Sequence, residues 1–88
     1  MIKKNITIIN KLGLHARAAA KLLDVASRFH SESKIIKSNS SVNAKSIMGL
    51  MMLGASKGTE LEFVVEGDDE KEAITAIEEL INNRFGEE

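Results

Sequence analysis

The 88-residue sequence contains no cysteine, proline, tyrosine or tryptophan. Without cysteine, the chain cannot form a disulfide, a thiolate metal site or a thiol nucleophile. Three phenylalanines are the only aromatic residues. This scarcity argues against nucleic-acid binding by base stacking, because that mode needs exposed aromatic platforms.

Neither sign of charge is in excess, since 12 Lys and Arg stand against 13 Asp and Glu. Basic residues form no block, so we expect no binding to a nucleic-acid backbone. No apolar run reaches the roughly 20 residues of a membrane span, and the first residues lack the apolar stretch of a signal peptide. The sequence therefore predicts a soluble protein without membrane insertion, and the absence of cysteine permits a cytoplasmic location.

The length predicts a single small domain over residues 1–88. A domain of this size buries only about 60 to 65% of its unfolded surface. We therefore expect chemistry at the surface and no deep catalytic pocket. The spacing of His, Asp and Glu residues suggests no metal site and no cofactor.

The apolar pattern predicts seven elements, in the order strand, helix, strand, strand, helix, strand, helix. Two-residue alternation predicts strands over about residues 2–9 and 60–66, and a hairpin whose turn falls in residues 38–41. Helical spacing predicts helices over residues 16–29, after Ser46, and from Asp69, where Glu72 has capping-box spacing. Alternating strands favour an α+β fold with a mainly antiparallel sheet, one face of which is covered by helices.

The segment Gly13-Leu14-His15-Ala16-Arg17 carries the clearest chemical signal, because it places a histidine at the start of a predicted helix. The first amides of a helix have no intrahelical partner, and its N-terminus carries about half a positive charge. If His15 attacked a phosphoryl group, the amides of Ala16 and Arg17 and the Arg17 guanidinium would bind the product phosphate. The alternative is that His15 is only a capping or surface histidine.

Two motifs resemble one known family. The stretch Lys11-Leu12-Gly13-Leu14-His15-Ala16-Arg17 is similar to the active-site segment of HPr, the histidine phosphocarrier of the bacterial phosphoenolpyruvate-dependent phosphotransferase system. A second stretch, Lys45-Ser46-Ile47-Met48-Gly49-Leu50-Met51, resembles the regulatory serine segment of that family. The resemblance covers essentially all 88 residues.

This resemblance implies an HPr-like open-faced β-sandwich, with four antiparallel strands covered on one side by three helices (βαββαβα). It also implies that His15 accepts a phosphoryl group on Nδ1 from phosphorylated enzyme I and passes it to an enzyme IIA domain, while Arg17 helps to hold it. Such a protein takes part stoichiometrically and is not an enzyme. A freely docking carrier is most simply a monomer.

One position departs from the family pattern. The family usually has proline directly after the motif arginine, where this chain has Ala18. Because alanine restores an amide donor and is a good helix former, we expect transfer to be retained. The segment Ile9-Asn10-Lys11-Leu12-Gly13 resembles the nitrogen-related paralogue of HPr, so sugar uptake and a regulatory branch both stay open.

Ser46 is the second candidate site. A serine before a helix is often a plain N-cap. By resemblance, Ser46 is the residue that HPr kinase/phosphorylase modifies, and its phosphate would add about two negative charges to a docking surface. The alternative function is therefore a regulatory binding module controlled through Ser46, with little or no role in sugar uptake.

The helix after Ser46 has more apolar residues than one buried stripe needs. We expect Leu50 and Leu53 to face inward, and Ile47, Met48 and Met51 to lie at least partly outward as a partner-binding surface, since methionine adapts to different partners. Basic residues near His15 should steer acidic partner surfaces to the site; these are Arg17, Lys21, Arg28 and Lys45.

Overall fold

The computed structural model describes residues 1–87 and contains one four-stranded sheet. Its strands are β1 (Ile2–Thr7), β2 (Glu32–Lys37), β3 (Ser40–Asn43) and β4 (Glu60–Glu66). The spatial order is β1-β4-β2-β3, and every neighbouring pair is antiparallel. The predicted antiparallel sheet is confirmed, and the strands that pair most extensively lie far apart in the sequence.

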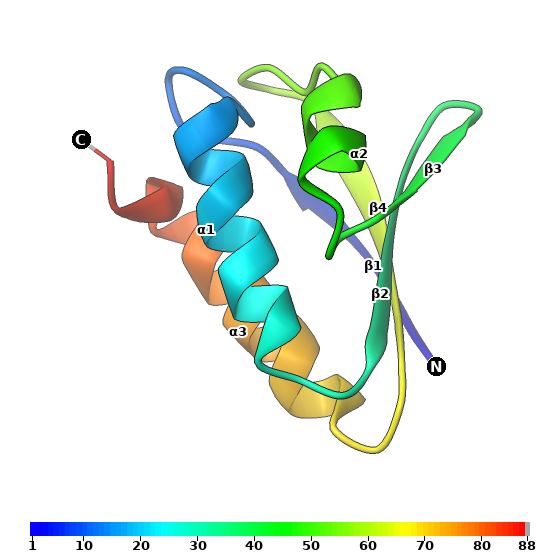
Figure 1. Cartoon of the computed structure of the whole chain (residues 1–88). Coiled ribbons are helices and arrows are strands. Elements are labelled where there is room, and N and C mark those ends of the chain that lie inside the picture. Colours follow the sequence, from blue (N-terminus) through cyan, green and yellow to red (C-terminus); the bar gives the residue numbers. More distant parts are fainter. Residues whose placement is uncertain (88) are drawn as a thin grey trace.

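Three helices cover the same face of this sheet (Figure 1). They are α1 (Ala16–Ser27), α2 (Ile47–Met52) and α3 (Glu70–Asn82), and the short 3-10 turn η1 (Arg84–Gly86) follows α3. The other face of the sheet has no helix among residues 1–87 (Figure 1). This arrangement confirms the predicted βαββαβα order and α+β fold class.

The core lies between the sheet and the helices. Leu61, Phe63 and Val65 of β4 are buried, while α1 contributes its stripe of Ala19, Leu22 and Ala26. The alternation in the strands and the helical spacing in α1 therefore each place their apolar side on the core, as the sequence predicts.

The first strand ends at Thr7, two residues earlier than predicted. Ile8 is nevertheless buried and pairs with the loop before β4, because its amide donates to Thr59 O at 2.9 Å and its carbonyl accepts from Gly58 N at 2.7 Å. The apolar alternation continues past the regular strand because Ile8 still faces the core.

The predicted hairpin is confirmed, since β2 and β3 pair from Lys34–Asn43 to Lys37–Ser40. Its two-residue connection includes Ser38, which has a φ of 54°. A left-handed residue in this position matches the right-handed twist of the paired strands.

The predicted capping box of α3 is wrong. Asp69 occupies the N-cap position, but its side chain makes no capping hydrogen bond. Its carboxylate instead accepts hydrogen bonds from the amides of His30 and Ser31, at 2.8 and 2.9 Å, and from the Ser31 hydroxyl. Asp69 therefore fastens the α1–β2 connection to the start of α3, a long-range use that sequence spacing does not reveal.

Candidate functional site

His15 is positioned by a loop that packs against the segment between α2 and β4. Gly13 has a φ of +69°, and a Cβ at this residue would lie 2.5 Å from the carbonyl oxygen of Ala55. The next amide, that of Leu14, donates to the same carbonyl at 2.8 Å. Only glycine fits this combination of left-handed backbone and close approach, so Gly13 fixes where the chain enters α1.

His15 is the N-cap residue of α1, and no side chain among residues 1–87 caps this helix. The first intrahelical hydrogen bond runs from Ala19 N to His15 O at 2.8 Å. The amides of Ala16, Arg17 and Ala18 therefore have no partner within the helix. The predicted juxtaposition of an imidazole with unpaired amides at a positive helix end is present.

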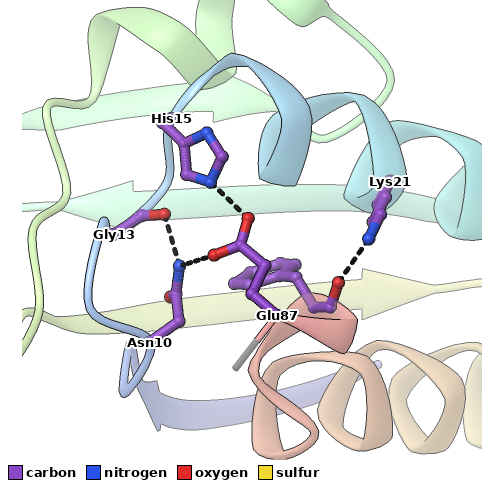
Figure 2. A network of polar contacts seen from close by, with 6 residues as sticks. Asn10, Gly13, His15, Lys21 and Glu87 are labelled. Atoms are coloured by element: carbon purple, nitrogen blue, oxygen red, sulfur yellow. Dashed lines mark hydrogen bonds and ion pairs between the residues drawn. The ribbon is translucent and has the colours of Figure 1, made fainter.

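The imidazole is partly buried, because only 27% of the His15 side chain is exposed. Its Nε2 contacts the carboxylate of Glu87, which follows η1 (Figure 2). The other oxygen of that carboxylate accepts a hydrogen bond from Asn10 Nδ2 at 3.1 Å. Figure 2 shows the second ring nitrogen, Nδ1, on the edge of the ring that faces away from Glu87.

Glu87 is held as an ionised carboxylate at neutral pH. Burial raises the pKa of Glu87, but hydrogen bonds from Asn10 and His15 and the nearby charge of Lys21 outweigh that effect. The pKa of Glu87 therefore lies below its ordinary value.

Two of the four predicted cations, Arg17 and Lys21, lie close to Glu87. Arg17 and Lys21 line a shallow depression of about 450 Å³ together with Lys11, Leu12, Gly86 and Glu87. Lys21 Nζ donates to the Phe85 carbonyl at 2.6 Å (Figure 2). Arg17 is exposed and forms no ion pair with the rest of residues 1–87.

The other two predicted cations lie away from His15, so the expected clustering of all four is wrong. Arg28 follows α1, and its guanidinium pairs with the Asp24 carboxylate at 2.7 Å. At about 1.5 Å of rise per residue, Arg28 lies about 18 Å along the helix axis from Ala16. Lys45 donates to the Phe29 carbonyl at 2.9 Å, which places it near the same far end of α1. The charges along the sequence do not show that Arg17 and Lys21 lie near one end of α1 whereas Arg28 and Lys45 lie near the other.

An exposed apolar surface lies beside the start of α1. The apolar patch consists of Ala16, Ile47, Met48, Met51 and Met52. Leu50 and Leu53 are buried, whereas Ile47, Met48 and Met51 are exposed, as predicted. Met52, which the sequence analysis did not assign to this surface, is 80% exposed.

Ser46 begins α2. Its hydroxyl oxygen accepts a hydrogen bond from Gly49 N at 3.2 Å, and the residue is half-buried. The N-cap interpretation is therefore confirmed, and Ser46 directly precedes Ile47, which belongs to the apolar patch.

Sequence reasoning missed Asn10 and Glu87. The sequence pattern assigns Asn10 no role in the site, yet its side chain is fully buried and also donates to Gly13 O at 2.8 Å. A signal for Glu87 was available in Phe85, because a large apolar residue flanked by Asn83 and Gly86 indicates that the chain turns back onto the core after α3.

Comparisons with known proteins agree with this architecture. The family model for "PTS HPr component phosphorylation site" matches residues 2–83. Phosphocarrier protein HPr from Neisseria meningitidis is 58% identical over 87 residues, which cover 99% of this chain and 98% of that protein. Its counterpart from Treponema pallidum is 49% identical over the full length of both chains. The chain therefore belongs to the HPr family of phosphocarrier proteins of the phosphotransferase system.

Solved structures of the family share the fold. HPr from Thermoanaerobacter tengcongensis superposes with a TM-score of 0.96 at 52% identity and covers 100% of this chain and 99% of that one. Another structure from the same organism is described as an HPr dimer, with a TM-score of 0.80 at 52% identity over 99% of this chain and 100% of that one. The expected monomer thus stays a prediction. Within residues 1–87, no helix combines the length and apolar character needed to cross a membrane.

Proposed function

We propose that this chain accepts a phosphoryl group on Nδ1 of His15 from phosphorylated enzyme I and transfers it to an enzyme IIA domain. The observation that carries the proposal is the partly exposed imidazole at the start of α1, two residues before the exposed Arg17. Unpaired amides and the helix dipole stabilise an anion, and a guanidinium binds phosphate oxygens in a charge-matched geometry. This site therefore stabilises a phosphoryl group without a metal or cofactor.

The same geometry favours a carrier over an enzyme. A phosphoryl group on His15 lies at the protein surface, where a partner's active site can reach it. The donor and acceptor proteins complete the reaction, and each transfer uses the chain stoichiometrically. A cytoplasmic location and a monomeric state belong to this proposal, because each transfer requires the exposed site to meet a different partner.

The apolar patch and the nearby cations are the proposed docking surface. Ile47, Met48 and Met51 offer adaptable apolar contacts next to Ala16. Arg17 and Lys21 add positive charge in the depression that Glu87 also lines, which favours acidic partner surfaces. Arg28 and Lys45 extend the positive charge toward the far end of α1.

Labelling with phosphoenolpyruvate and enzyme I tests the proposal. The wild-type chain is expected to take up one phosphoryl group that is labile in acid and stable in base. The His15→Ala variant is expected to take up none, because the nucleophilic nitrogen is lost. The matched control is His30→Ala, which removes an exposed histidine at the α1–β2 connection. Label of the same kind on His15→Ala would end the proposal.

A regulatory role through Ser46 is the second candidate. It is supported by the position of Ser46 at the N-cap of α2, directly before Ile47 of the apolar patch, and by similarity to Crh, a catabolite repression protein of Bacillus subtilis. That structure is 39% identical with a TM-score of 0.76, and the match covers 96% of this chain and 97% of that one. A phosphate on Ser46 would add negative charge to the docking surface and impede partners that present acidic groups.

Incubation with ATP and an HPr kinase/phosphorylase distinguishes the two roles. We expect an acid-stable phosphoserine that is absent from Ser46→Ala and present in the control Ser56→Ala, which removes an exposed serine of the loop before β4. Absence of acid-stable phosphate from the wild-type chain would remove the regulatory role while leaving transfer through His15 intact.

A further inference from the structure

We propose that Glu87 is a positioning residue that keeps the proton of His15 on Nε2, so that the lone pair of Nδ1 is available to the incoming phosphoryl group. This inference rests on the proposed function and assigns it a residue outside both sequence motifs. The carboxylate of Glu87 contacts Nε2 directly and is itself fixed by Asn10 (Figure 2).

The hydrogen bonds of Asn10 show which groups around Glu87 donate and which accept. Asn10 Nδ2 donates at 2.8 Å to the backbone carbonyl of Gly13, which can only accept. The same amide nitrogen therefore supplies its second hydrogen to Glu87 Oε1 at 3.1 Å. An ionised carboxylate is likewise only an acceptor. The contact between its other oxygen and the ring consequently requires a hydrogen on Nε2, and the neutral ring then has its lone pair on Nδ1.

This pairing suits the chemical step in both directions. When Nδ1 attacks, a bond forms between Nδ1 and phosphorus, and the bond between phosphorus and the donor atom of enzyme I breaks, with its electron pair staying on that donor atom. The proton on Nε2 stays in place, so the His15 ring gains a positive charge that the Glu87 carboxylate offsets. In the transfer to an acceptor, the Nδ1–phosphorus bond breaks and its electron pair returns to the His15 ring as the charge on the ring is lost.

The backbone before Glu87 is organised to deliver its side chain to the site. Arg84 and Phe85 have φ values of 54° and 55°, and Gly86 follows with 74°. Non-glycine residues rarely adopt this left-handed conformation, which persists only when surrounding contacts impose it. Phe85 is fully buried, and its carbonyl accepts a hydrogen bond from Lys21 of α1 at 2.6 Å. The helix that follows His15 thus also anchors the turn that precedes Glu87.

The distribution of ring tautomers tests the inference directly. Long-range proton–nitrogen correlation spectra of ¹⁵N-labelled protein at about pH 8.5, where an ordinary imidazole is neutral, report which ring nitrogen carries the hydrogen. The wild type is expected to show hydrogen on Nε2 and a bare Nδ1. Glu87→Gln replaces the acceptor by an amide that can also donate, so a mixture of tautomers is expected. Glu72→Gln, on the exposed first turn of α3, is the matched control and is expected to resemble the wild type.

The rate of phosphoryl uptake provides a second readout. Hydrogen-bond partners that orient metal-bound histidines typically contribute about 10- to 100-fold to affinity or activity. By analogy, we expect Glu87→Gln to take up phosphoryl groups roughly 10-fold more slowly than the wild type. Glu87→Asp keeps the charge one methylene shorter and should restore part of the rate. Amide spectra of each variant verify that the fold is unchanged.

The outcomes separate this inference from the carrier function. If the wild type is labelled on His15 while Glu87→Gln keeps the wild-type tautomer and rate, the positioning role is overturned and the carrier function stands. If the wild type takes up no label, the carrier function is overturned, and the tautomer spectra still decide whether Glu87 sets the proton position.

Discussion

Two carboxylates make contacts that connect distant parts of this chain. Asp69 accepts hydrogen bonds from His30 and Ser31, and Glu87 contacts Asn10 and His15. Sequence spacing indicated a local capping role for Asp69 and no role for Glu87. A carboxylate has several acceptor sites, so each of these two side chains binds the donors that lie close to it in space.

Asp69 is expected to make stability depend on pH. The side-chain hydrogen bond from Ser31 and the backbone hydrogen bond from His30 lower the pKa of Asp69, and they outweigh the opposing effect of burial. A carboxyl group with a lower pKa in the folded state contributes stability above its unfolded pKa and loses it as pH falls through the folded value. We therefore expect Asp69→Asn to lower the free energy of unfolding at pH 7, and this deficit to shrink below about pH 4.

Urea unfolding between pH 7 and pH 2.5 measures that deficit. Asp68→Asn is the control, because it removes a neighbouring exposed carboxylate that forms no hydrogen bond within residues 1–87. A deficit of the same size for Asp69→Asn at every pH would contradict the assignment.

At the scale of elements, the short turn η1 matters more than its three residues suggest. The turn reverses the chain after α3, buries Phe85 and is joined to α1 through Lys21. The left-handed residues Arg84 and Phe85 cost about 1–2 kcal/mol each in backbone energy. Burial of the Phe85 ring, worth roughly 1.5–3 kcal/mol, offsets much of that cost.

Removing the Phe85 ring should therefore release the turn. We expect Phe85→Ala to lower the free energy of unfolding by about 3–5 kcal/mol, because it leaves a cavity in the core, and to loosen the contact between Glu87 and His15. Denaturant unfolding measures the first effect, and the His15 ring tautomers report the second.

Met52→Ala is a suitable comparison for that experiment, since Met52 is largely exposed. Its expected change lies within about 0.5 kcal/mol. Equal losses in the two variants would show that Phe85 does not anchor the turn.

At the scale of the whole molecule, the candidate site lies at one end of the helical layer. The loop before α1, the apolar patch beside α1 and the segment after α3 meet there. The sheet order β1-β4-β2-β3 supports this meeting, because it places the loop after β1 next to the loop before β4. His15, the apolar patch and the cations Arg17 and Lys21 therefore lie at the same end of the domain.

The sequence by itself determined the order of elements, the α+β class and the position of His15 at a helix start. These features depend on local periodicity and on glycine and capping chemistry, which act over a few residues. It also indicated that α2 has more apolar residues than the core can bury. The exposure of Ile47, Met48 and Met51 confirms that expectation.

Only the tertiary structure decided the partners of Asp69, Asn10 and Glu87, and the separation of Arg28 and Lys45 from His15. Those contacts join residues as far apart as 10 and 87, so they depend on how helices and loops pack. A carboxylate, an amide or an ammonium group has no periodic signature, because its partner is set by proximity in space. The proton position that we assign to His15 follows from such packing and could not be inferred from its motif.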